Sequence, residues 1–158
     1  MIHVNVYEKW WMGLTTLMLV VFAAAVGVSA FMGGIQVPIP EARIDPRVVA
    51  TDPKFKDGSV QMLAPGKYVA YVRAQASPWK FFPEKIEVPL HSTVTFYVTS
   101  GDVQHGFRIE GTNINVMILP GQVSKMTAKF DKAGEFPFIC HEYCGVGHQN
   151  MFGKVIVK

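Results

Sequence analysis

The chain has 158 residues, which allows one modest domain with an appendage. Its hydrophobic content of 49% is high for a soluble domain, and the excess lies near the N-terminus. The formal net charge of +3 is too small to indicate nucleic-acid binding, and it is unchanged without residues 1–33, because Glu8 and Lys9 cancel. We therefore expect no nucleic-acid partner.

The N-terminal region predicts a membrane-spanning helix. No charged residue lies between Lys9 and Glu41, and residues 11–31 are almost entirely apolar. About twenty such residues in a helix cross the hydrocarbon core of a bilayer, which is ~30 Å thick. Trp10 beside Lys9 is typical of an interfacial anchor, and the Gly33-Gly34 pair is a helix stop.

We expect residues 1–33 to be a retained transmembrane anchor. The alternative is a secretory signal peptide, for which Val28-Ser29-Ala30 would supply a small-residue cleavage site. The apolar stretch is longer than in most signal peptides, and the segment before it holds a single lysine. Basic residues stand on both sides of the helix, so charge alone gives no orientation.

Beyond the anchor, the pattern predicts a linker and then an all-β domain. Residues 34–66 are rich in Pro, Asp, Lys and Gly and are interpreted as the linker. In residues 67–158, apolar and polar side chains alternate between turn signals, which favours about seven short strands and a β-sandwich. The strands are expected at 68–74, 85–88, 93–99, 106–109, 123–130, 135–140 and 153–157.

Both cysteines of the chain lie in one short run, with metal-ligand residues close by. Cys140 and Cys144 are followed by His148 and Met151, and His105 lies upstream in a Gly-containing hairpin. Thiolate, imidazole and thioether together suit copper. One cysteine with two histidines and a methionine completes a mononuclear electron-transfer site, so the other thiolate is surplus. Two thiolates bridging two copper ions would use every ligand.

The competing interpretation of the cysteine pair is a disulfide, which is common in extracytoplasmic domains. A disulfide would leave His105, His148 and Met151 without a shared purpose. The spacing therefore favours a metal site.

The run 140–151, with His105 about 35 residues upstream, resembles the dinuclear copper A site of cytochrome c oxidase subunit II. The similarity extends over residues 98–115, 119–121 and 147–153, and it includes the N-terminal apolar segment. A single such segment, where most subunits II carry two, points to the B-type branch, which includes the ba-type oxidases. The implied fold is a cupredoxin-like Greek-key β-sandwich over residues 67–158, attached to one N-terminal transmembrane helix.

The resemblance also implies the ligands. Cys140 and Cys144 would bridge two coppers, with His105 and Met151 as terminal ligands on opposite sides and His148 on the other copper. The backbone carbonyl of Glu142 would be the remaining weak ligand. In larger oxidases the side chain at this position helps to hold magnesium against subunit I, a role that B-type members need not keep. His141 is expected not to be a ligand.

The implied function is electron transfer within a terminal oxidase. The chain would accept electrons from a c-type cytochrome and pass them to haem in subunit I, where oxygen is reduced to water. Its partners would be subunit I, the cytochrome and membrane lipid, and its copper domain would lie on the extracytoplasmic (periplasmic) side of the inner membrane. The aromatic segment 77–83 would either plug the end of the sandwich or form a landing patch for the donor, with Trp79 receiving electrons.

Three alternatives remain at this point. The first is a membrane-tethered mononuclear blue-copper electron carrier, which the surplus Cys140 disfavours. The second is a fragment of nitrous oxide reductase, which also needs a large histidine-rich domain, whereas this chain has five histidines. The third is a quinol-oxidising subunit II, which keeps the fold without copper and is disfavoured by the intact ligand set.

Overall fold

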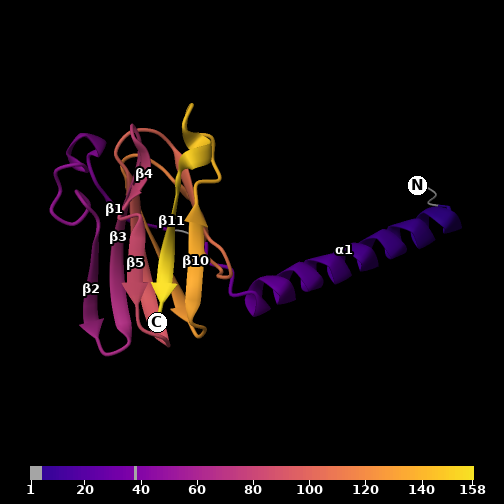
Figure 1. Cartoon of the computed structure of the whole chain (residues 1–158). Coiled ribbons are helices and arrows are strands. Elements are labelled where there is room, and N and C mark those ends of the chain that lie inside the picture. The colour runs from indigo at the N-terminus through magenta and orange to yellow at the C-terminus, as the bar shows by residue number, and fades with distance from the viewer. Residues whose placement is uncertain (1–4, 38) are drawn as a thin grey trace. The chain divides into compact units, whose positions relative to one another are not determined.

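The computed structural model describes residues 5–37 and 39–158, so the first four residues of the expected anchor and residue 38 of the expected linker lie outside it. The chain divides into two compact units, with the boundary between Ile35 and Gln36. The first unit contains one long helix and the second contains the β-structure (Figure 1).

Helix α1 spans Val6–Met32 and has defined ends. Asn5 caps its start, because the Asn5 side chain accepts a hydrogen bond from the Tyr7 N–H at 3.0 Å while the Glu8 carboxylate accepts one from the Asn5 N–H at 2.9 Å. At the other end the Gly33 N–H donates to the Ser29 carbonyl at 2.8 Å. Its 27 residues extend about 40 Å, which exceeds the ~30 Å hydrocarbon core. Within the described residues this is the one helix long and apolar enough to cross a membrane.

The second unit is a sandwich of two sheets, which confirms the expected all-β class. In the described part of the chain one sheet has the order β1-β9-β6-β3-β2, with β4 also paired to β3, and the other has the order β5-β11-β10-β7-β8. The strands of the first sheet are β1 Pro40–Arg43, β2 Ser59–Ala64, β3 Lys67–Ala76, β4 Trp79–Phe82, β6 Ser92–Ser100 and β9 Gln122–Phe130. Those of the second are β5 Lys85–Val88, β7 His105–Ile109, β8 Asn115–Ile118, β10 Gly134–Ile139 and β11 Phe152–Val157.

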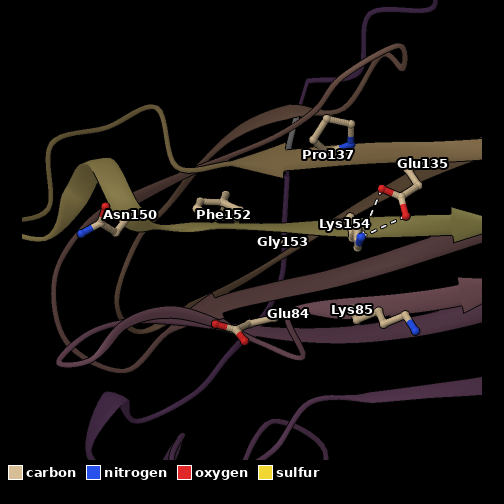
Figure 2. Close-up of a pocket in the computed structure, with 8 residues that line it drawn as sticks. All are labelled: Glu84, Lys85, Glu135, Pro137, Asn150, Phe152, Gly153 and Lys154. Atoms are coloured by element: carbon tan, nitrogen blue, oxygen red, sulfur yellow. Dashed lines mark hydrogen bonds and ion pairs between the residues drawn. The ribbon is translucent and has the colours of Figure 1, made fainter.

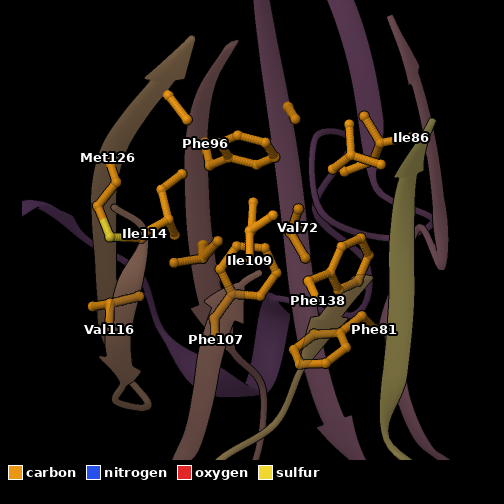
Figure 3. Close-up of a cluster of buried hydrophobic side chains, with 14 of the residues drawn as sticks. Val72, Phe81, Ile86, Phe96, Phe107, Ile109, Ile114, Val116, Met126 and Phe138 are labelled. Atoms are coloured by element: carbon orange, nitrogen blue, oxygen red, sulfur yellow. The ribbon is translucent and has the colours of Figure 1, made fainter. Parts of the chain in front are cut away.

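Aromatic side chains fill the space between the sheets (Figure 3). Phe107 packs against Phe81 at 5.5 Å and against Phe138 at 5.2 Å between ring centroids, and Phe96 lies 6.0 Å away. Each of these rings is fully buried, a state that stabilises a side chain of this size by about 1.5–3 kcal/mol. Phe81 therefore belongs to the core and cannot serve as an exposed landing patch.

The predicted strands agree with the structure to within one or two residues. In β9, the buried positions Met126, Ala128 and Phe130 alternate with the more exposed Thr127 and Lys129, as expected for a strand with one buried face. The prediction that residues 34–66 form only a linker is wrong, because this segment contributes β1 and β2 to the first sheet. Between them, Val49 and Phe55 pack over the outside of the same sheet.

Near the start of the sandwich unit, the Gln36 side-chain amide pairs with the backbone of β9 as a neighbouring strand would. Gln36 Nε2 donates to the Thr127 carbonyl at 2.7 Å, and the Thr127 N–H donates to Gln36 Oε1 at 3.0 Å. Thr127 lies on β9 beyond the end of its pairing with β1, which stops at Ser124. The Gln36 amide thus completes the hydrogen bonding of β9 where β1 no longer reaches.

We predict that Gln36→Ala lowers the free energy of unfolding of a soluble 34–158 fragment by about 1–3 kcal/mol, because two hydrogen bonds of about 0.5–1.5 kcal/mol each are lost. Urea unfolding followed by circular dichroism measures the change. Gln61→Ala, at an exposed position of β2, is the matched control and should have little effect. An unchanged urea midpoint for Gln36→Ala would show that the amide does not secure β9.

Candidate metal centre

The candidate ligands meet at one end of the sandwich because of how three strands are paired. Cys140 directly follows β10 and Met151 directly precedes β11, and these strands pair with Ile139 opposite Phe152. The Cys140 N–H donates to the Met151 carbonyl at 3.1 Å and closes the loop 140–151 at its base. His105 begins β7, which pairs with the other side of β10. Figure 1 shows this loop at the end of the sheet where β10 finishes and β11 starts.

The sulfur atoms lie at the middle of the cluster. Cys140 Sγ is 3.8 Å from Cys144 Sγ, and a disulfide would require about 2.0 Å, so both thiols are free. The ligand atoms of His105, Cys140 and Cys144 all lie within 4.8 Å of one another, and all three residues are buried.

Each sulfur has its own set of neighbours. Cys140 Sγ lies 3.9 Å from His105 Nδ1 and 3.2 Å from the Glu142 carbonyl oxygen. Cys144 Sγ lies 3.5 Å from His148 Nδ1 and 3.8 Å from Met151 Sδ. The structure therefore brings together all six residues that the sequence nominates, in two groups that share the pair of sulfurs. These six residues are His105, Cys140, Glu142, Cys144, His148 and Met151.

The two thiols differ in acidity. Burial raises the pKa of Cys140, but hydrogen bonds from the His105 ring and the Gly106 N–H outweigh it and lower that pKa to about 7. Burial raises the pKa of Cys144 to about 12, and the charge of Cys140 adds to the effect. Cys140 therefore loses its proton more readily than Cys144. A metal ion at the sulfurs would favour both thiolates, and its binding would release their protons.

Trp79 packs against the loop 140–151, which specifies the packing role that the sequence offered as one of two interpretations of segment 77–83. The Trp79 Nε1–H donates to the Cys144 carbonyl at 3.2 Å, and the ring is half-buried. A Cβ added at Gly147 would overlap Cδ2 and Cε3 of the ring, so only glycine lets the loop lie this close. Gly145 lies against the same ring and has φ of +121°, which favours glycine for a second reason.

His141 lies beside the candidate ligands and has contacts of its own. Its ring packs over Gly106, where an added Cβ would lie 2.7 Å from the imidazole, and its Nδ1 lies 3.4 Å from Glu142 Oε1. The Glu142 carboxylate is also within 3.5 Å of the Gln104 amide nitrogen. These side chains form a polar rim beside the cysteines.

Asp102 is a second residue that the sequence did not reveal as part of the site. Its Oδ1 lies 3.0 Å from Nε2 of His105, the ring nitrogen that faces away from the cysteines. Burial raises the pKa of Asp102, but hydrogen bonds from His105 and from the backbone N–H groups of Ala76 and Val103 outweigh it and lower that pKa to about 2. The carboxylate is therefore ionised at neutral pH.

A separate hollow of about 710 Å³ lies on the outer face of β5, β11 and β10 (Figure 2). Four of its eight lining residues are charged, and two of these, Lys154 and Glu135, form an ion pair at 2.9 Å. The residues that line it include no histidine or cysteine. The chemistry-bearing side chains are therefore those of the 140–151 loop and the start of β7.

Comparison with known proteins places these features in context. Residues 79–158 match the family model described as cytochrome c oxidase subunit II, periplasmic domain. The chain is 41% identical over 156 residues to a cytochrome c oxidase subunit 2 of Thermus thermophilus, covering 96% of this chain and 92% of that protein. It is 39% identical over 68 residues to cytochrome c oxidase subunit 2 of Saccharomyces cerevisiae, covering 43% of this chain and 27% of that protein.

Solved structures show the same fold. A chain of a haem–copper terminal oxidase dimer, determined by cryo-EM, superposes with a TM-score of 0.76 at 32% identity and covers 96% of this chain and 99% of that chain. The periplasmic domain of subunit II of cytochrome oxidase from Bradyrhizobium japonicum superposes with a TM-score of 0.52 at 20% identity, covering 57% of this chain and 83% of that one. The cupredoxin-like fold expected from the sequence is confirmed.

We predict that Gly147→Ala destabilises the metal-free sandwich by about 1–3 kcal/mol, since the added methyl group must displace the indole or the loop. The backbone of Gly147 is not in the left-handed region, so overlap with Trp79 is the specific cost. Urea unfolding measures the effect. Gly101→Ala is the control, because its added Cβ would meet nothing closer than 3.7 Å.

A double-mutant cycle isolates the cause. In a Trp79→Ala background the cost of Gly147→Ala should largely disappear. An equal cost in both backgrounds would show that the ring is not what excludes a side chain at this position.

Proposed function

Because this chain belongs to the cytochrome c oxidase subunit II family, we propose that it receives electrons for a terminal oxidase at a dinuclear copper centre. The observation that carries the proposal is the pair of free, buried sulfurs 3.8 Å apart, each flanked by its own candidate ligands. The residues that would hold the centre are His105, Cys140, Cys144, His148, Met151 and the backbone carbonyl of Glu142.

The spacing of the sulfurs fits shared metal ions. A thiolate bond to a first-row ion such as zinc is about 2.3 Å, so sulfurs 3.8 Å apart can both contact the same ion. His105 Nδ1 and the Glu142 carbonyl lie beside one sulfur, and His148 Nδ1 and Met151 Sδ beside the other. A mononuclear blue-copper site would use one cysteine and leave the other thiol buried and unused.

Copper bound there would supply a one-electron redox couple. The chain's contribution is a rigid set of ligands whose positions change little with oxidation state. Cys140 and Met151 are held by paired strands and by their own backbone hydrogen bond, and Cys144 is held through its carbonyl by Trp79. His105, Cys140 and Met151 are also shielded from water, which limits solvent rearrangement around the centre.

We infer the rest of the pathway from the family. Electrons would arrive from a c-type cytochrome and leave to haem in subunit I, where oxygen is reduced to water. Helix α1 would anchor the chain in membrane lipid as a single span, as expected for a B-type subunit. The sandwich would lie on the extracytoplasmic side of the inner membrane, and the description of the matching family as a periplasmic domain supports this side.

Magnesium at the interface with subunit I stays a prediction with little support. Mg²⁺ prefers six oxygen ligands in octahedral geometry. The neighbours of the Glu142 carboxylate are nitrogen atoms of His141 and Gln104. This setting favours a hydrogen-bonding role for the carboxylate.

We predict that the fully loaded protein contains two coppers per chain. Cys140→Ser and Cys144→Ser should each abolish the two-copper centre, because a bridging thiolate holds both ions. Met151→Leu should keep both coppers and alter the reduction potential, because a thioether is a weak axial ligand. Metal analysis and electron paramagnetic resonance of the purified protein measure both effects. One copper per chain with a blue single-site spectrum would support the mononuclear carrier instead.

The donor would dock on exposed apolar residues of the copper loop. Trp79 lies beneath the loop and Phe81 is in the core, so the landing patch expected from segment 77–83 is not available as a whole. Tyr143 and Val146, by contrast, are 79% and 83% exposed on the loop that carries the cysteines. Exposed apolar residues at such a place are typical of interaction sites.

We therefore predict that Val146→Ser slows reduction by the physiological c-type cytochrome about 3- to 10-fold, as expected from losing roughly 1 kcal/mol of apolar contact. Stopped-flow rates at low and high salt should differ little for the wild type, because apolar contact is not screened. Leu63→Ser, exposed on β2, is the matched control. A steep fall of the wild-type rate with salt, with no effect of Val146→Ser, would rule out apolar docking here.

A further inference from the structure

Asp102 occupies a junction between the turn that leads to His105 and the end of β3. Its Oδ1 faces His105 Nε2 at 3.0 Å and accepts the Val103 N–H at 2.7 Å. Its Oδ2 accepts the Ala76 N–H at 2.6 Å, and the Ser100 hydroxyl lies 3.2 Å from Oδ1. These contacts fix the carboxylate from several directions, and Ala76 stands just before the turn to Trp79.

The orientation of His105 gives this carboxylate a specific task. His105 is fully buried, and its Nδ1 points toward Cys140 while its Nε2 points toward Asp102. A neutral imidazole that offers the lone pair of Nδ1 to a metal must carry its proton on Nε2. The Asp102 carboxyl group, with Oδ1 3.0 Å from Nε2, accepts that proton in a hydrogen bond, and thereby selects this tautomer and holds the plane of the ring.

The second imidazole is held differently. His148 is partly exposed, with its Nδ1 beside Cys144 and its ring 5.9 Å from that of Tyr143. Among the described residues, no carboxylate contacts His148. The two halves of the centre are thus unequal, since one imidazole is backed by a fixed negative charge and the other faces the loop surface.

We propose that Asp102 is a positioning residue that orients His105 toward the copper centre. It would make His105 the more basic, more strongly binding of the two imidazole ligands. This inference rests on the proposed function in requiring copper at the cysteines. It holds for one copper or for two, since His105 is a candidate ligand in either site. Because a hydrogen-bonded carboxylate increases the basicity of an imidazole ligand, it favours the oxidised metal.

The test compares Asp102→Asn with the wild-type full-length protein in detergent. Asparagine keeps the size of the side chain and removes the charge, and its one oxygen can replace either Oδ1, which faces Val103 and His105, or Oδ2, which faces Ala76. We expect copper affinity to fall by about 10- to 100-fold, as is typical when such a carboxylate is lost. The reduction potential should rise, and the nitrogen hyperfine coupling of one histidine should change in electron paramagnetic resonance.

Asp131→Asn is the matched control. Asp131 also contacts a histidine, with Oδ1 3.3 Å from His91 Nδ1, but that pair is exposed at the turn before β10, whereas Cys140 follows the other end of that strand. It should leave affinity, potential and hyperfine coupling unchanged. Urea unfolding of the metal-free variants separates a general loss of stability from an effect on the site.

Unchanged affinity, potential and hyperfine coupling in Asp102→Asn would overturn the proposal. If that variant does not fold, Asp102→Glu replaces it. This change keeps the charge and moves the carboxylate by one methylene, so the His105 coupling should shift while Asp131→Glu leaves it unchanged. A wild type that takes up only one copper would refute the dinuclear centre, and the same comparison would still decide the role of Asp102.

Discussion

The antiparallel pairing of β10 with β11 determines where the candidate ligands lie. With Ile139 opposite Phe152, the residues just outside the pair are Cys140 and Met151, and their backbone hydrogen bond fixes the width of the loop between them. A shift of one residue in this register would turn every side chain of a strand to the opposite face. The core phenylalanines and the ligand geometry therefore depend on the same strand register.

The site packs closely because glycine occupies the positions where the backbone lies against a large ring. Gly147 and Gly145 lie against Trp79, and Gly106 lies against His141, so aromatic rings fill the space that Cβ atoms would need. This arrangement brings two thiols into a buried position where the ionisation of the second is strongly opposed. A metal ion bound between the sulfurs would offset the electrostatic cost of the second negative charge.

Much of the fold and most of the cluster of candidate ligands could be predicted from the sequence, because both depend largely on local patterns. The longer strands show alternation over several residues, and the cysteines, His148 and Met151 lie within twelve residues of one another. The strands β1, β2, β4 and β8 are short or mostly exposed, so they lack a clear apolar period. They form because neighbouring strands offer free backbone groups, which no local pattern records.

The supporting residues of the site escaped prediction for a similar reason. Trp79 contacts Cys144 across 65 positions of sequence, and the aromatic segment 77–83 was equally compatible with a plug at the end of the sandwich and with a surface patch. Asp102 lies three residues from His105 in a Ser-Gly-Asp stretch that is equally typical of an ordinary turn. Only the three-dimensional structure shows that the carboxylate faces the imidazole.

The parallel pairing of β5 with β11 has a consequence for the order of assembly. Residues 85–88 pair with residues 154–157, so the second sheet closes only after residues 154–157 have been made and have found a partner about seventy positions away. Pairings over such distances are slow to form because a long loop must close first. The copper loop lies immediately before β11, and we expect its ligands to converge late. Metal delivery would then meet an already folded domain, which separates copper insertion from chain folding in time.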